Sequence, residues 1–214
     1  MTIKAIIFDL DGTIIDSEYY FVKRTMQFAK DHHFHIAYED ALSLVGLSHR
    51  DYLKRLAILL DHDLHEITNM YGEYKNAHPV PYGQLINQDA YDLIQYLKDS
   101  PYRIALATST YRNILHDKLS STGLSDTFEV EISGDMIEKA KPDPQIYLEC
   151  IKSLDLKPEE CMAIEDSEVG IKAAHDAGLY VIARKDPHFD TDQSLADIII
   201  EDLRNIVQIL KEGE

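Results

Sequence analysis

The sequence predicts an α/β protein in which an α-helical cap domain is inserted into a doubly wound, Rossmann-like parallel sheet. Short apolar runs rich in Ile, Val and Ala alternate with amphipathic stretches, and one long segment contains no strand-like run. Short continuous apolar runs are typical of buried parallel strands, and their alternation with helices indicates βαβ units. We expect residues 1–15 and 83–214 to form the core domain and residues 16–82 to form the cap.

The strands of the core are its clearest elements. Six segments have the length and composition of buried strands: 3–8, 103–108, 128–133, 161–166, 179–184 and 196–200. Helical periodicity lies between them, in residues 89–99, 112–123, 144–155 and 167–178, and a terminal helix follows the last strand. Two of these helices have end signals. Asp143 before Pro144 is typical of an N-cap with proline at the first helical position. In the next helix, Ser167 is the expected N-cap and Gly178 the expected C-terminal glycine.

The expected cap contains only helical patterns. Residues 19–33, 49–62 and 64–77 are amphipathic, and the sequence HPVPYG at 78–83 interrupts any helix. The histidines within residues 32–35 end the first of these stretches. We interpret them as part of a helix end, where cations are favourable, rather than as a metal site.

Composition limits the classes of function. The chain has 21 basic and 38 acidic residues, a net charge of −17, which repels nucleic acid and anionic lipid. No window approaches the roughly 18 apolar residues of a membrane span, and there is no signal-peptide pattern. We expect a soluble cytoplasmic protein with no nucleic-acid or membrane partner, present as a monomer or weak dimer. Cys150 and Cys161 have no metal-site or redox spacing, so we expect reduced core or boundary residues.

Polar side chains gather where the predicted strands end, and the ligand site of an open parallel sheet lies outside the carboxyl ends of its strands. These side chains are Asp9, Asp11, Thr108, Ser109, Thr110, Lys141, Glu165 and Asp166. Four carboxylates in one crevice repel one another by several kcal/mol unless a cation binds or some take up protons. Mg²⁺ prefers oxygen ligands and bridges to phosphate, while hydroxyls and a lysine suit the phosphoryl oxygens. The pattern predicts a magnesium-dependent phosphoryl-transfer site, and no P-loop sequence is present.

The first pair of carboxylates has the spacing of two cooperating groups. Residues two apart on an extended segment share a direction, so Asp9 and Asp11 both face the ligand if the chain stays extended. One can attack phosphorus to form an aspartyl-phosphate, and the other can handle the proton of the leaving oxygen. Gly12 and Thr13 allow a sharp turn that places backbone amides near the phosphate.

Four segments together resemble the haloacid dehalogenase superfamily: DLDGT, ATST, KAKPDP and IEDSEVGIKAA, in this order across nearly the whole core. The helical insertion after the first of them is similar to the cap of the subgroup that contains phosphoglycolate phosphatase-like hydrolases and β-phosphoglucomutase.

The resemblance implies a role for each matching residue. Asp9 would be the nucleophile, and Asp11 the general acid and base whose backbone carbonyl also binds the metal. Glu165 and Asp166 would complete the Mg²⁺ site. The phosphoryl group would be held by Ser109, Lys141 and, with a softer assignment, Thr110 and Asn113.

The cap is expected to select a small phosphorylated metabolite as the substrate. The stretch LVGLSHRDYLKRL resembles the cap loop of β-phosphoglucomutase, with Gly46 as a turn residue. Where that mutase has a phosphate-binding arginine this chain has His49, followed by Arg50, and where it has a histidine in the first cap helix this chain has Phe21. These departures favour a phosphatase.

The mutase remains open as an alternative, because Arg50 and Lys54 could supply the missing contact from a shifted turn of helix. A haloacid dehalogenase is less favoured, since it would not need Asp11 or the acidic metal pair. A receiver-type signalling domain is also less favoured, because it is shorter and has no inserted cap. A binding module without catalysis would tolerate the loss of a carboxylate, and none is lost.

Overall fold

The computed structural model describes residues 2–185 and 190–212. The chain forms two compact units, one made of residues 1–16 and 82–214 and the other of residues 17–81. Hereafter they are the core unit and the helical unit, and each is described by itself. In the described part of the chain, no helix has both the length and the apolar content that a membrane crossing requires.

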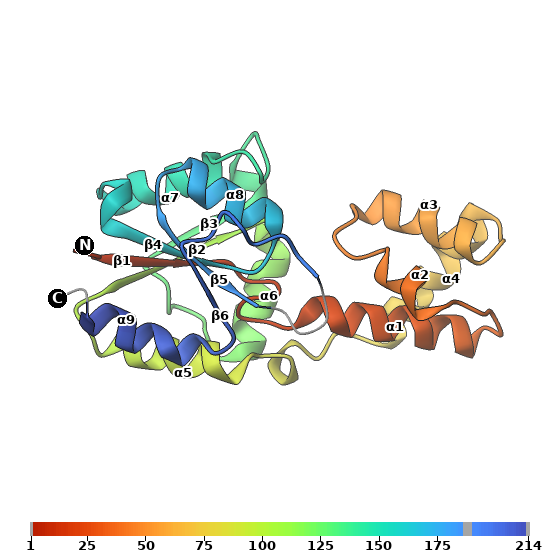
Figure 1. Cartoon of the computed structure of the whole chain (residues 1–214). Helices are drawn as coiled ribbons and strands as arrows, with labels where there is room; N and C mark the ends of the chain where they lie inside the picture. Colours follow the sequence, from red (N-terminus) through yellow and green to blue (C-terminus); the bar gives the residue numbers. More distant parts are fainter. Residues whose placement is uncertain (1, 186–189, 213–214) are drawn as a thin grey trace. The chain divides into compact units, whose positions relative to one another are not determined.

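The core unit contains one six-stranded sheet, as the sequence predicts (Figure 1). Its strands are β1 (Ala5–Phe8), β2 (Arg103–Thr108), β3 (Val130–Ser133), β4 (Cys161–Glu165), β5 (Tyr180–Arg184) and β6 (Ile198–Ile200). Their spatial order is β3-β2-β1-β4-β5-β6, and every pairing is parallel. The α/β class with a doubly wound sheet is therefore confirmed, with β1 at the centre, where the order reverses.

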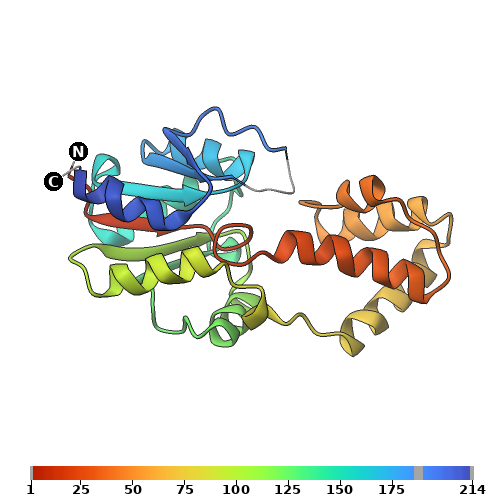
Figure 2. The same cartoon turned by 60° about the horizontal axis from the view of Figure 1, so that its bottom comes forward.

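Helices cover both faces of the sheet (Figure 1, Figure 2). They are α5 (Gln88–Lys98), α6 (Arg112–Thr122), α7 (Gln145–Leu154), α8 (Glu168–Asp176) and α9 (Ile206–Glu212). Successive residues of a strand point to opposite faces, so Ile6 and Phe8 pack with α5, α6 and α9 while Ala5 and Ile7 pack with α7 and α8. The small residues of the second face let α7 and α8 approach closely. Both cysteines are free and buried in that layer, which agrees with the expected core placement.

The predicted helix ends are largely confirmed. Ser167 caps α8 by accepting a hydrogen bond from the amide of Gly170, and Gly178 follows the helix with φ +82°. The assignment of the first residues of α7 was wrong by one position. Pro144 stands at the N-cap position, with φ −70° and ψ −3°, and the helix begins at Gln145. Asp143 still has the predicted capping contact, because its Oδ1 accepts from the amide of Gln145 at 3.1 Å.

The helical unit contains four helices within its residues 17–81: α1 (Ser17–Asp31), α2 (Tyr38–Leu42), α3 (His49–Leu59) and α4 (Leu64–Ala77). The short helix α2 was not predicted. Phe28 lies at the centre of the unit, with the ring of Tyr71 at 5.0 Å and that of Tyr74 at 5.3 Å. His32 packs on the same phenylalanine at 4.7 Å.

Candidate active site

Three carboxylates meet at the carboxyl ends of the two central strands. Asp9 directly follows β1, and its amide donates to the carbonyl of Ile164 in β4 at 2.9 Å. This parallel register places Asp9 beside Glu165 and Asp166, which end and follow β4. Each of the three offers a carboxylate oxygen within 4.8 Å of the others, and all three residues are buried. In the described residues no other group of three or more His, Cys, Asp and Glu side chains is close enough to share a metal ion.

Lys141 lies among these carboxylates. Its ammonium group donates to Asp9 Oδ1 and Glu165 Oε1, both at 2.6 Å, and to the carbonyl of Ala107 at 3.1 Å. Burial lowers the pKa of Lys141, but the two carboxylates raise it by more, so the net pKa lies above its ordinary value and the lysine stays charged. Burial raises the pKa of Asp9 to about 7; Lys141 opposes this shift and Glu165 adds to it.

Glu165 is fixed by its neighbours on every side. Its Oε1 accepts from Lys141 and from the hydroxyl of Tyr147 at 2.7 Å, and its Oε2 accepts from the amide of Asp166 and the hydroxyl of Ser167, both at 3.2 Å. A carboxylate has about four acceptor positions, and all of them are used here. A Cβ at residue 170 would lie 1.9 Å from Oε1, so only glycine fits beside this carboxylate. In this arrangement Glu165 anchors Lys141.

A tight turn carries the chain from Asp11 to the next residues of the motif. Gly12 has φ +83°, and a Cβ there would lie 1.9 Å from Asp166 Oδ2. The hydroxyl of Thr13 donates to Asp166 Oδ1 at 3.2 Å, and the side chain of Asn87 donates to the carbonyl of Thr13 at 2.8 Å. Gly12 thus provides both the backbone conformation and the space that let the DLDGT segment approach Asp166.

Asp11 has different partners from Asp9. Its carboxylate accepts from Lys118 Nζ at 2.5 and 2.7 Å and from the hydroxyl of Thr110 at 2.6 Å. It is still near enough to Asp9 to contribute to the raised pKa of Asp9. The two carboxylates lie close together, but each has a lysine of its own.

Sequence reasoning missed two residues of the site, Lys118 and Tyr147. Both occupy positions on the buried faces of helices: Lys118 stands beside Leu119 on α6, and Tyr147 beside Ile146 on α7. A charged or hydroxyl-bearing side chain within an apolar helical stripe was the available signal, because such a group needs a polar partner inside the protein.

The polar residues at the end of β2 and in the segment that follows it divide into buried and exposed groups. Thr108 is buried, and its hydroxyl accepts from the amide of Thr110 at 3.0 Å. Ser109 and Asn113 are exposed, and neither side chain makes a hydrogen bond within the part of the chain that the structure describes. The structure therefore brings Thr110 to Asp11 and leaves Ser109 and Asn113 open to solvent.

The predicted substrate residues of the cap lie in the helical unit. Gly46 has φ +76° in the segment between α2 and α3, which agrees with a turn. His49 and Arg50 are the first two residues of α3 and are exposed. Partial burial and the charge of Lys75 lower the pKa of His49. Lys54, which could assist Arg50 under the mutase alternative, is paired with Asp51 at 3.3 Å.

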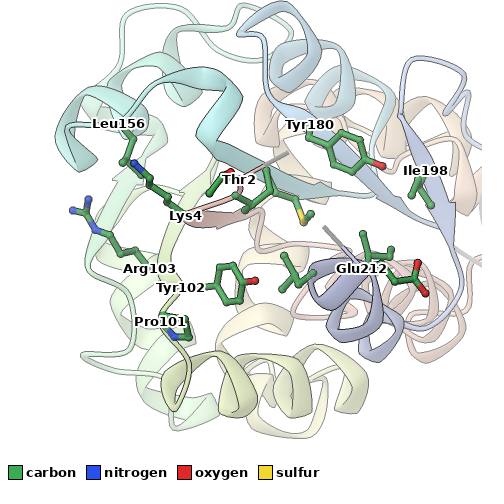
Figure 3. Close-up of a pocket in the computed structure, with 13 residues that line it drawn as sticks. Thr2, Lys4, Pro101, Tyr102, Arg103, Leu156, Tyr180, Ile198 and Glu212 are labelled. Carbon is green, nitrogen blue, oxygen red and sulfur yellow. The ribbon is translucent and has the colours of Figure 1, made fainter. Parts of the chain in front are cut away.

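A separate cavity of about 790 Å³ lies at the amino ends of the strands, whereas the carboxylate cluster lies at their carboxyl ends (Figure 3). Its lining includes Lys4, Tyr102, Arg103 and Tyr180, which stand at or before the amino ends of their strands. It contains none of the residues described above, so this cavity and the carboxylate cluster are distinct features.

A parallel sheet with an aspartate after its central strand, a buried lysine and a second acidic pair defines a phosphoryl-transfer type of site. Residues 6–184 match the family of haloacid dehalogenase-like hydrolases, so the chain belongs to that family.

Named relatives and solved structures agree with this assignment. The chain is 28% identical over 180 residues to a phosphorylated carbohydrates phosphatase of Thermotoga maritima, covering 82% of each chain. It is 26% identical over 187 residues to the pyrophosphatase PpaX of Bacillus mycoides, covering 86% of this chain and 84% of the relative. A crystal structure of a candidate β-phosphoglucomutase from Thermotoga maritima superposes with a TM-score of 0.84 at 26% identity, over 99% of this chain and 100% of the other.

Proposed function

We propose that the protein is a Mg²⁺-dependent phosphatase that hydrolyses a small phosphorylated metabolite through an aspartyl-phosphate at Asp9. The observation that carries this proposal is the buried contact of Lys141 with Asp9 and Glu165 beside Asp166. The relatives named as phosphatases support the hydrolytic reaction. We further propose that the enzyme works in the cytoplasm, as a monomer or weak dimer, without nucleic-acid or membrane partners.

The chemistry of the donor set fits a divalent cation. Three carboxylates and one lysine leave two negative charges when all are ionised, in a buried site where repulsion is strong. Asp9, Asp166 and the backbone carbonyl of Asp11 would hold Mg²⁺, and Glu165 would join them only if it gave up some of its present partners. Bound there, Mg²⁺ would neutralise the cluster and polarise the phosphoryl oxygens.

The two oxygens of Asp9 have unequal roles. Oδ1 accepts from Lys141, whereas Oδ2 has no hydrogen-bond partner within the described residues. Oδ2 is therefore the atom available to attack phosphorus. Lys141 fixes the carboxylate, and because its three N–H groups already donate to Asp9, Glu165 and the carbonyl of Ala107, it would donate to a phosphoryl oxygen by exchanging one of these acceptors.

Asp11 would carry the proton of the reaction. Its carboxylate accepts hydrogen bonds from Lys118, and it would accept a proton from the water that hydrolyses the intermediate. The proton gained can then protonate a leaving oxygen in the next turnover. Ser109, Thr110 and Asn113 remain the proposed phosphoryl contacts of the loop after β2, and Gly46, His49 and Arg50 the proposed substrate contacts of the helical unit.

Substitution of the nucleophile tests the proposal. Asp9→Asn is expected to abolish Mg²⁺-dependent hydrolysis of p-nitrophenyl phosphate, because an amide cannot form the acyl-phosphate. Asp117→Asn is the matched control, since this aspartate lies on α6 with 79% of its side chain exposed. Retained turnover in Asp9→Asn would remove the assigned nucleophile.

A β-phosphoglucomutase-type phosphomutase is the second candidate, favoured by the likeness to the Thermotoga maritima structure. The two reactions are separated by incubation with β-glucose 1-phosphate and a trace of its bisphosphate. Release of inorganic phosphate indicates the phosphatase, and formation of glucose 6-phosphate indicates the mutase. Phe21 and His49, where the mutase has histidine and arginine, lead us to expect phosphate release.

A further inference from the structure

A buried amide side chain joins the carboxyl ends of two strands in the core unit. Gln193 lies in the segment between β5 and β6 and is only 7% exposed. Its Nε2 donates to the backbone carbonyl of Asp166 and to that of Arg184, both at 2.8 Å. An amide nitrogen carries two N–H groups, so both are used here. Because both partners are carbonyl oxygens, they also determine the orientation of the amide.

Gln193 extends the connection between β4 and β5. These strands pair in parallel as far as Glu165 and Ala183. Asp166 is the next residue after this last pair, and α8 begins only at Glu168. The side chain of Gln193 therefore links the two strands one residue beyond the end of their ladder.

The segment that carries Gln193 is itself anchored. The amide of Ala196 donates to the carbonyl of Gln193 at 3.0 Å, which closes a turn. Asp197 then binds Val181 of β5 twice, since its amide donates to the Val181 carbonyl at 2.9 Å and its Oδ2 accepts from the Val181 amide at 2.7 Å. Glutamine is seldom buried, and this one is fixed at its backbone by a turn and at its amide by two carbonyls. The side chain is therefore a fixed donor.

Asp166 is the residue of the site that this donor restrains. Its carboxylate belongs to the buried cluster of three carboxylates whose oxygens lie within 4.8 Å of one another. The hydroxyl of Thr13 donates to its Oδ1 at 3.2 Å, and its Oδ2 fills the space beside Gly12. Thr13 and Gly12 thus restrain the carboxylate, whereas Gln193 restrains the backbone from which the carboxylate extends.

Arg184 connects the same segment to Gly12. Its carbonyl accepts from Gln193, while Nη1 of its guanidinium donates to the carbonyl of Gly12 at 3.4 Å. Its Nη2 lies 3.5 Å from Asp89 on α5. Gln193 therefore contacts both Asp166 and the residue that supports the Gly12 turn.

We propose that Gln193 is a positioning residue of the metal site, which holds the Asp166 carboxylate where a divalent cation binds it; this role rests on the Mg²⁺ site of the proposed function. Mg²⁺ requires nearly ideal octahedral geometry at about 2.0–2.1 Å, so displacement of one ligand weakens its binding. Partners that orient a metal ligand commonly contribute about 10–100-fold to metal affinity or activity. Gln193 acts through the backbone of Asp166, and Asp166 supplies the oxygen to the cation.

Binding of Mn²⁺ to the full-length protein, followed by the electron paramagnetic resonance signal of the free ion, tests this role without enzymatic activity. Gln193→Met keeps the length of the side chain but removes both donors, so it should raise the Kd for Mn²⁺ at least about tenfold. Gln193→Glu has nearly the same shape without the two N–H groups and should give a similar loss. Ser194→Ala, an exposed neighbour in the same segment, should leave the Kd unchanged.

A purely structural role of Gln193 predicts a different result. It would lower the urea midpoint of metal-free Gln193→Met but leave the Kd for Mn²⁺ at the wild-type value, and that outcome would overturn the proposal. Leu97→Ala is the control for general destabilisation, because this leucine is fully buried on the last turn of α5, which leads to the amino end of β2. Its loss of packing should lower the urea midpoint with an unchanged Kd.

The wild-type protein provides a test that does not depend on how the variants fold. The side-chain amide signals of Gln193 in the ¹⁵N NMR spectrum, assigned from the backbone, should shift saturably as Mg²⁺ is added, because this amide binds the carbonyl of a ligand residue. The signals of Gln208, which is exposed on α9, should stay in place. Unmoved Gln193 signals in a protein that binds Mg²⁺ would contradict the role.

Failure of the proposed function and failure of this role give different results. A wild type that binds neither Mn²⁺ nor Mg²⁺ refutes the metal site and the role of Gln193 with it, whereas equal Mn²⁺ affinities of the wild type and Gln193→Met refute the role alone. A wild type that binds the metal but hydrolyses no phosphate ester refutes the phosphatase, and the Mn²⁺ comparison still decides the role. In the active enzyme, Gln193→Met should raise the Mg²⁺ concentration at half-maximal rate by the same factor as the Kd, with KM for p-nitrophenyl phosphate unchanged at saturating Mg²⁺.

Discussion

Replacement of Lys141 by methionine should strongly destabilise the metal-free protein. The change leaves Asp9 and Glu165, with side chains 10% and 0% exposed, in contact with an apolar group instead of an ammonium. Each 2.6 Å contact corresponds to about 6 kcal/mol of attraction at an effective dielectric of about 20. Desolvation of the three groups offsets most of this attraction, and loss of one partner of a buried pair costs about 3–5 kcal/mol in total.

The effect should depend on pH in a defined direction. Lys141 lowers the pKa of Asp9, which burial has raised to about 7, so its removal moves that pKa higher still. A carboxyl group whose folded pKa is raised contributes stability at low pH, and this contribution is lost as pH rises through the folded value. The stability deficit of Lys141→Met should therefore grow as pH increases past about 7.

Urea unfolding in chelator-treated buffer, followed by circular dichroism across a series of pH values, measures this deficit. Lys139→Met is the matched control, because it lies two positions away on the same segment, is 72% exposed and makes only a 3.6 Å surface pair. A double-mutant cycle with Asp9→Asn should show coupling, since the amide no longer needs the cation. A deficit below about 1 kcal/mol, equal to that of the control, would refute the assignment of Lys141 as the compensating charge.

Three other perturbations follow from the same geometry. Lys118→Met should lower kcat by about tenfold or more with little change in KM, measured with p-nitrophenyl phosphate, because Asp11 loses its two shortest nitrogen contacts. Gly12→Ala should destabilise the protein by at least about 2 kcal/mol in urea unfolding, because its φ of +83° and a 1.9 Å clash both oppose a Cβ. Asp9→Asn should flatten the pH dependence of metal-free stability between 3.8 and about 7, where the wild type loses stability as the raised carboxyl ionises.

The changes at Lys118 and Gly12 each have a control within the chain. Lys98→Met on α5 removes an exposed lysine and should leave kcat unchanged. Gly72→Ala on α4 meets nothing within 4 Å and should be neutral or stabilising, since alanine is the better helix former. Equal kcat losses at 98 and 118, or equal stability changes at 12 and 72, would contradict the roles given to Lys118 and Gly12.

The sheet and its helices could be predicted because parallel strands are buried on both faces and therefore read as continuous apolar runs. The run at 103–108 coincides with β2, and the other five strands lie within their predicted segments. The short helix α2 was missed for a physical reason. It has five residues, and its N-cap residue Ala37 makes no side-chain capping bond, so neither periodicity nor a start signal marks it.

The part of the candidate site that depends on the order of the strands was predictable from the sequence. Asp9, Glu165 and Asp166 come together because β1 and β4 are neighbours and their carboxyl ends share an edge. The partners contributed by helices were not predictable in the same way. Whether Lys118 reaches Asp11 depends on how α6 is rotated against the sheet, and sequence periodicity identifies a buried face without identifying the atom that it meets.

The two lysines give Asp9 and Asp11 different surroundings, as the opposite tasks proposed for these two carboxylates require. A shared environment would give Asp9 and Asp11 similar affinities for a proton, which suits neither a nucleophile nor a proton carrier. Here Asp9 is buried with Lys141, and Asp11, with 28% of its side chain exposed, pairs with Lys118. The positive φ of Gly12 ends the extended conformation directly after Asp11. The negative charges of Asp9 and Asp11 at the end of β1 are thus compensated by two lysines, Lys141 and Lys118. Lys118 belongs to α6, and no sequence motif marks it there.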